Sequence, residues 1–101
     1  MAANWCYSAG FSTAMALEVS RVAVQELKLG TWLKEFNIMC RNDDSAYAIK
    51  GRTNIGHEFS AHIWIGGPSN GDLTFCTHQM TEIYRAKFSR NSDCEITVEF
   101  L

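Results

Sequence analysis

The spacing of hydrophobic residues changes once along the chain, close to Trp32. From Ser12 to Leu29, apolar residues recur every three or four positions, which predicts a single long helix. Ser12 or Thr13 is a suitable N-cap, and Gly30 suits the position just after the helix end. The polar stripe of this helix is narrow and consists of Glu18, Arg21, Gln25 and Lys28. We therefore expect a curved sheet, the N-terminal segment or a second subunit to cover its broad apolar flanks.

After Trp32, apolar and polar residues alternate with a period of two, which is typical of β-strands with one buried face. The predicted strands are 34–41, 46–53, 57–65, 73–80, 82–90 and 95–101. Residues 79–90 also satisfy helical spacing, so a short helix is the alternative there. The N-terminal stretch NWCYSA alternates as well and is a candidate for an additional strand.

The turn residues between these strands predict antiparallel hairpins with defined registers, because a slip of one residue would turn every side chain to the other face. The pairs that follow from the turns are Cys40 with Tyr47, Ile38 with Ile49, Glu35 with Arg52, Tyr47 with Ile63, Arg52 with Glu58, Ile63 with Phe75, His62 with Cys76, Ser60 with His78, and Phe88 with Ile96. In these registers the odd-numbered aliphatic residues of 57–65 face the helix, and His62 and Trp64 face away from it.

Together these elements predict a single α+β domain over residues 1–101, in which one long N-terminal helix packs on a curved antiparallel β-meander of five to six strands. By topology this arrangement resembles a cystatin-like or similar roll. Likeness of fold does not carry function with it.

Composition excludes several classes of partner and location. The chain has 101 residues and a formal net charge of −2, with no broad basic field, so nucleic acid is a disfavoured partner. No run approaches the roughly 20 apolar residues that a membrane span needs. The N-terminus lacks a basic region followed by an uninterrupted apolar stretch, so we expect a cytoplasmic protein whose four cysteines stay reduced.

Three residues of one predicted sheet face carry chemistry: His62, Cys76 and His78. They include good zinc ligands, but a fourth ligand is missing and flat strands resist a tetrahedral arrangement. A Cys76 nucleophile with His62 as its base would lack preorganised donors for a developing negative charge. The sequence therefore predicts no metal site, no cofactor and no catalytic residue.

The same outer face has the composition of a protein-binding surface, with an aromatic anchor and a polar rim. Its predicted partner-binding residues are Trp64, His62, His78, Met39, Lys50 and Arg52. We expect a non-enzymatic protein-binding module of the inhibitor or adaptor type, with homodimerisation possible and with the final strand as a second route of contact. The N-terminal segment with Trp5 and Tyr7 could instead cover this face within the monomer.

The alternative function is a small-ligand-binding or catalytic roll with a pocket between helix and sheet. Tyr47, Tyr84 and Cys40 would form its polar wall, since all three point inward in the predicted registers.

Overall fold

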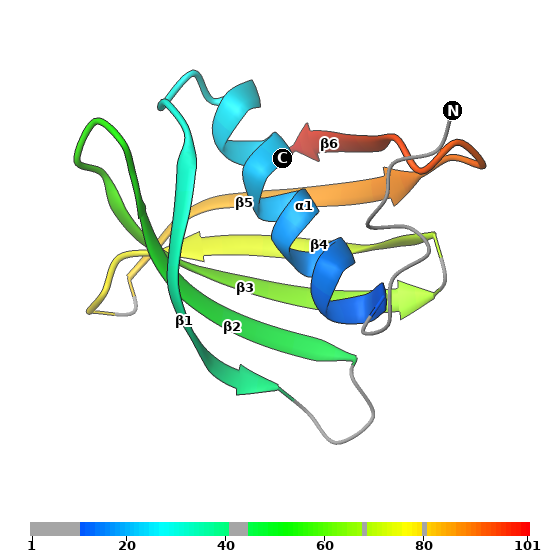
Figure 1. Ribbon diagram of the computed structural model, residues 1–101, viewed down its shortest axis with the longest axis horizontal. Helices are drawn as coiled ribbons and strands as arrows, with labels where there is room; N and C mark the ends of the chain where they lie inside the picture. The colour runs from blue at the N-terminus through cyan, green and yellow to red at the C-terminus, as the bar shows by residue number, and fades with distance from the viewer. Residues whose placement is uncertain (1–10, 41–44, 68, 80) are drawn as a thin grey trace.

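The computed structural model describes residues 11–40, 45–67, 69–79 and 81–101, with the backbone alone for residues 11–12 and 34–40. One helix, α1 (Phe11–Glu26), is followed by six strands. These are β1 (Trp32–Cys40), β2 (Ala46–Thr53), β3 (Glu58–Gly67), β4 (Asn70–Cys76), β5 (Glu82–Arg90) and β6 (Ile96–Phe100). The strands form one antiparallel sheet in chain order, which curls around α1 (Figure 1). The predicted α+β fold, with a helix on a curved meander, is confirmed.

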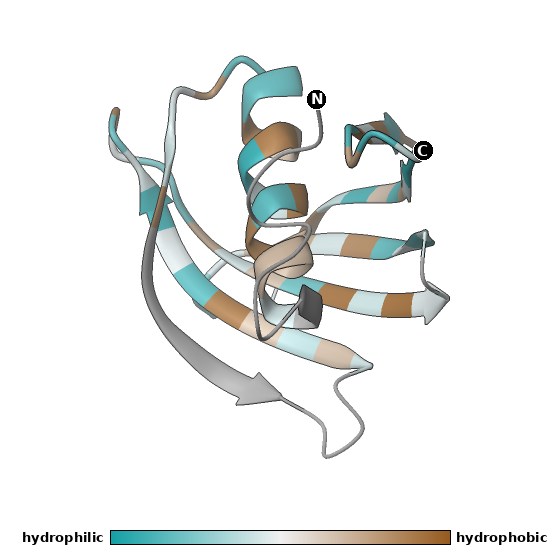
Figure 2. Ribbon diagram, turned by 45° about the vertical axis from the view of Figure 1, so that its right-hand side comes forward, coloured by the Kyte–Doolittle hydropathy of each residue, from teal (hydrophilic) through white to brown (hydrophobic). Residues whose placement is uncertain are grey.

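The core lies between α1 and the concave face of the sheet. It is built from alternate strand residues, and this alternation is visible as brown and pale bands along the central strands in Figure 2. Ile49, Ala61, Ile63 and Phe75 are fully buried there and pack in one cluster with Met15 and other residues of α1. Burying each large apolar side chain contributes about 1.5–3 kcal/mol, so this alternation decides which face of each strand turns inward.

Helix α1 ends earlier than the sequence predicts. Lys28 adopts a left-handed conformation with φ 58°, its N–H donates to the Gln25 carbonyl, and the N–H of Leu29 donates to the Val24 carbonyl. These bonds form a Schellman motif in which Lys28 takes the place that glycine usually occupies. The prediction that Gly30 terminates the helix is therefore wrong. Thr13 does not act as an N-cap, because it lies inside α1 and its hydroxyl donates to the Tyr47 hydroxyl at 3.3 Å.

The register of β2 and β3 is confirmed, with Tyr47 opposite Ile63 and Arg52 opposite Glu58. Between β1 and β2, the pairing of Cys40 with Tyr47 is also confirmed. Two irregularities then shift the rest of β1, so that Arg52 lies opposite Leu33. The predicted pairs of Arg52 with Glu35 and of Ile49 with Ile38 are wrong, because each bulge adds a residue to one strand only.

Two further hairpins are shifted by two residues. Ile63 lies opposite Leu73, not Phe75, and Phe88 lies opposite Val98, not Ile96. The β3–β4 connection is tighter than predicted, with Gly67 paired to Asn70. A shift of two residues preserves the face of each side chain, so the predicted inward and outward positions on β3 and β4 are correct.

Strand β4 ends at Cys76, before His78, and residues 82–90 form a strand rather than the alternative helix. The turn between them contains no glycine, asparagine or proline. Instead, the Thr77 N–H donates to the Thr81 carbonyl at 2.8 Å, and the Thr81 N–H donates to the Thr77 hydroxyl at 3.1 Å. A threonine side chain thus supplies the closure that a turn-forming residue would otherwise provide.

Two observations bear on location. Cys94 is buried and disulfide-bonded, so the expectation that all cysteines stay reduced is wrong for this residue. Disulfides are typical of oxidising compartments, and a cytoplasmic location remains a prediction. The helix in the described part of the chain lacks the length and hydrophobicity to cross a bilayer.

The additional strand that the sequence predicts near the N-terminus, in NWCYSA, lies outside the described residues.

Candidate protein-binding surface

Two aromatic side chains project from the middle of β3 on the convex face of the sheet. His62 and Trp64 alternate with the core residues Ala61 and Ile63, so they point away from α1. Their rings stack with centroids 6.3 Å apart and an interplanar angle of 25°. Trp64 is 45% exposed, which is unusual for a large aromatic residue held in a regular strand. The predicted orientation of this pair is therefore correct.

His62 is half-buried and lacks a partner for one ring nitrogen. Its Nε2 atom is inaccessible to solvent and has no hydrogen-bond partner. Burial lowers the pKa of His62, because the charged imidazolium loses hydration that the surroundings do not replace. The ring is therefore held neutral, and it serves as an apolar support for the indole of Trp64.

The neighbours of this pair on β2 are small. Ala46 lies opposite Trp64 and Ala48 lies opposite His62, and both alanines are buried. Ser60 and Cys76, paired with each other one step along the strands, are buried as well. The indole thus lies beside small side chains on β2 and beside the charged Asp72 on β4.

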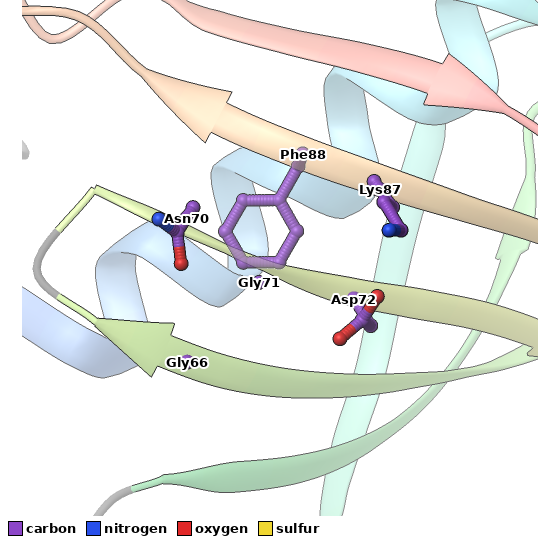
Figure 3. Close-up of a pocket in the computed structure, with 6 residues that line it drawn as sticks. All are labelled: Gly66, Asn70, Gly71, Asp72, Lys87 and Phe88. Carbon is purple, nitrogen blue, oxygen red and sulfur yellow. The ribbon is translucent and has the colours of Figure 1, made fainter.

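An open hollow of about 330 Å³ lies at the end of the sheet where β3 and β4 connect (Figure 3). Its lining residues are Gly66, Asn70, Gly71, Asp72, Lys87 and Phe88. Asp72 is the direct cross-strand partner of Trp64 and, on its other side, of Lys87. The Phe88 ring packs closely on Gly71, where an added Cβ would lie 2.5 Å from the ring. A side chain at position 71 would therefore clash with this ring and, at 2.1 Å, with the Trp64 carbonyl oxygen.

The sequence did not predict this hollow. The glycines and proline of the segment from Gly66 to Asp72 are typical of a hairpin tip, and the segment lacks the lysine and following helix of a phosphate-binding loop. The available signal was the presence of two glycines, Gly66 and Gly71, on facing strands beside a tryptophan.

His78 does not join the His62 and Trp64 pair. It lies beyond the end of β4, with Nδ1 3.0 Å from the Glu58 carboxylate and Nε2 3.3 Å from the Gly51 carbonyl oxygen. Its predicted position opposite Ser60 is wrong, because Cys76 takes that place.

The other predicted partner-binding residues extend away from the hollow along β2 and β1. Lys50 lies opposite Ser60 and is half-buried, and Arg52 is exposed opposite Glu58. Met39 pairs through its backbone with Ala48, and its side chain lies outside the described atoms. Trp5 and Tyr7, the alternative cover for this face, also lie outside the described residues.

The arrangement of His62, Cys76 and His78 fits neither a zinc site nor a cysteine nucleophile with a histidine base. His62 lies opposite Thr74, so it is not the direct partner of Cys76. Burial, together with the carboxylate of Glu82, raises the pKa of Cys76 and keeps the thiol protonated, whereas a nucleophile needs the thiolate. Among the described residues, no three histidine, cysteine or acidic side chains are grouped to hold a metal ion.

Comparisons with known protein families, curated proteins and solved structures find no match to this chain. Its function is therefore inferred from the chemistry of its own surface, since a helix on a curved sheet serves many unrelated functions.

Proposed function

We propose that this chain is a non-enzymatic protein-binding module, of the inhibitor or adaptor type, that docks a partner on the convex face around Trp64. The observation that supports this proposal is the half-exposed indole, which stacks on a neutral imidazole and whose cross-strand partner Asp72 lines an open hollow. Tryptophan is enriched among the residues that dominate binding energy, because it buries a large area while losing few rotamers.

The surroundings of the indole have the organisation of a small interface. The apolar centre is the Trp64 ring, and the polar rim is formed by Asn70, Asp72 and Lys87. Asp72 and Lys87 are exposed and oppositely charged, so the rim favours a partner segment that carries both charge and hydrogen-bonding groups. A side chain from such a segment fits the hollow while its neighbour covers the indole.

The stacking on His62 reduces the entropic cost of binding. An exposed side chain normally loses rotamer freedom when a partner immobilises it, at about 0.5–1.5 kcal/mol. The Trp64 ring is already placed against His62 in the described structure. Preorganisation of this kind leaves more of the buried area available as affinity.

The alternative, a ligand pocket between α1 and the sheet, has weaker support. The Tyr47 side chain is buried and its hydroxyl accepts a hydrogen bond from Thr13, while the Tyr84 ring packs edge-on against Phe100. These tyrosines are accounted for by contacts within the chain, and the side chain of Cys40 is not described. One observation favours the alternative: Nε1 of Trp32 is buried without an acceptor, which a ligand would supply.

Affinity capture from the source cells with three matched baits tests the proposal. The baits are the unmodified chain, Trp64→Ala, and Ile55→Ala as a control that removes another exposed apolar side chain at the β2–β3 turn. We expect a protein that the unmodified and Ile55→Ala chains retain and that Trp64→Ala loses. With the purified partner, Trp64→Ala should cost about 2 kcal/mol of binding free energy by calorimetry.

Equal binding of every captured protein to Trp64→Ala would contradict the proposal, provided that circular dichroism shows all three baits to be folded. Native mass spectrometry of the unmodified chain addresses the alternative. A small molecule that stays bound, and that is lost on Trp32→Phe, would favour a ligand-binding function.

A further inference from the structure

Strand β6 (Ile96–Phe100) is one edge of the sheet. It pairs with β5, and among the described strands none lies beyond it (Figure 1). An edge strand presents unpaired N–H and C=O groups to any chain that can adopt an extended conformation. The final strand is the predicted second route of contact, and the strand order places it at an edge of the described sheet.

The hydrogen bonds to β5 define which backbone groups of β6 point outward. The Leu101 N–H donates to the Arg85 carbonyl at 2.9 Å, and the Asn91 N–H donates to the Glu95 carbonyl at 3.1 Å. In an antiparallel ladder the bonded positions alternate, so Thr97 and Glu99 also turn their backbone groups toward β5. The N–H and C=O groups of Ile96, Val98 and Phe100 therefore turn toward the open edge.

The two edges of the sheet differ in regularity. Strand β1, at the opposite edge, contains two irregularities in its pairing with β2. The pairing of β6 with β5 is regular over its whole length. Bulges twist an edge and interrupt its hydrogen-bonding groups, which is a common protection against further pairing. Strand β6 carries no such protection.

The geometry points to a second copy of this chain as the occupant of the β6 edge, paired antiparallel about a two-fold axis at Val98. Val98 then faces Val98 of the partner subunit, and Ile96 faces Phe100 of the partner subunit. These three pairs use the outward backbone groups and form about six hydrogen bonds. The assembly joins the two sheets into one, and it goes beyond the proposed function because it uses a different strand.

The positions of the glutamates favour a two-fold axis at Val98 over an axis one residue to either side. With the axis at Val98, Glu99 lies opposite Thr97 of the partner subunit, so no two carboxylates face each other. An axis at Thr97 would place Glu95 opposite Glu99 of the partner subunit, and an axis at Glu99 would pair two identical glutamates. Like charges directly opposite each other in a sheet are destabilising.

The side chains on the concave side also complement one another. Val98 is buried and Ile96 and Phe100 are partly buried against the core, so each extends the apolar row up to the edge. Across the axis, Ile96 meets Phe100 of the partner subunit twice, and such aromatic and β-branched pairs stabilise antiparallel sheets. A two-fold axis perpendicular to the sheet places both copies of α1 on the same face. Of the strands, α1 makes its most extensive contact with β6, so the two helices lie near the junction.

Substitutions at Thr97 test the pairing, because this side chain is exposed and turns away from the core. Thr97→Lys places a lysine opposite Glu99 of the partner subunit at two symmetric positions, whereas Thr97→Glu places a glutamate there. We expect the dimer dissociation constant, measured by analytical ultracentrifugation over a concentration series, to fall about fivefold for Thr97→Lys and to rise about fivefold for Thr97→Glu. Thr97→Gln is the uncharged control and should change it by less than twofold.

The opposite signs identify the register. If the axis were at Thr97, both charged variants would repel themselves and both would weaken the dimer. A chain that stays monomeric at every concentration, or variants that shift the constant in the same direction, would overturn the inference. Trp64→Ala should leave the constant unchanged, so failure of the dimer and failure of the proposed protein-binding function are separately visible.

Discussion

Gly30 connects α1 to the sheet through a position that tolerates no side chain. It has φ 96°, and an added Cβ would lie 2.3 Å from the Asn54 Oδ1 atom, which accepts a hydrogen bond from the Thr31 N–H at 2.7 Å. We expect Gly30→Ala to lower the free energy of unfolding by about 2 kcal/mol, from backbone strain and the lost hydrogen bond.

Gly56 provides a matched control, because it has the same φ of 96° and no atom within 4 Å of an added Cβ. Gly56→Ala should therefore cost only the strain, about 1 kcal/mol. Urea denaturation of the two variants measures the difference. Equal losses would show that the contact with Asn54 contributes nothing.

His62 makes the stability of the fold depend on pH in a defined direction. Its pKa is lowered in the folded chain, while in the unfolded chain it titrates near 6.5. Below that pH the unfolded state binds the proton more readily, so stability is present above about 6.5 and is lost as the pH falls. We expect the free energy of unfolding to fall less between pH 7.5 and pH 5.5 in His62→Gln than in the unmodified chain. An unchanged difference in urea titrations would contradict the burial of this ring.

The sequence allowed individual side chains to be assigned to a face but not to a partner. Trp64 and His62 were placed correctly because alternation with Ala61 and Ile63 depends only on parity. The hollow depends on which residues of β4 lie opposite β3, and the predicted register there was displaced by two positions. His78 was misplaced for a different reason, since the end of β4 at Cys76 has no turn-forming residue to mark it.

Helix α1 ends on a residue that is poorly suited to its conformation. Lys28 occupies the left-handed position with φ 58°, where a Cβ atom is unfavourable. Lys28→Gly should raise the free energy of unfolding by about 0.5–1 kcal/mol. Gln25→Gly, on an exposed position inside the helix, should lower it by about 1 kcal/mol. Thermal denaturation that shows the same sign for both variants would contradict this assignment of the helix end.

The strands were predicted well in number and position, and their registers less well. The three-residue turn at 54–56 defines the register of β2 and β3, because Gly56 supplies the left-handed conformation such a turn requires. The two bulges in β1 leave no comparable mark in the sequence. In the β5–β6 connection, the Asn91 side chain accepts hydrogen bonds from the Asp93 and Glu95 N–H groups and thereby holds a longer loop than predicted.

The helix has a wider apolar surface than a flat sheet could bury, and this bears on the overall architecture. The width of this apolar arc predicted a curved sheet, the N-terminal segment or a second subunit as its cover. In the structure, Leu17, Val22 and Leu27 on the flanks of α1 pack against the core as partly buried residues. Function could not be inferred in the same way, because a binding surface need not follow the periodicity that a core imposes.

The two bulges of β1 also limit how many copies can join. A sheet with two regular edges can add chains at both ends without limit and grow into a fibre, as sheets that stack through exposed strands do. Here one edge is irregular, and in the proposed dimer the other edge is occupied by symmetric pairing. Association should therefore stop at a closed pair, and the chain should remain dispersed at concentrations where an evenly edged sheet would polymerise.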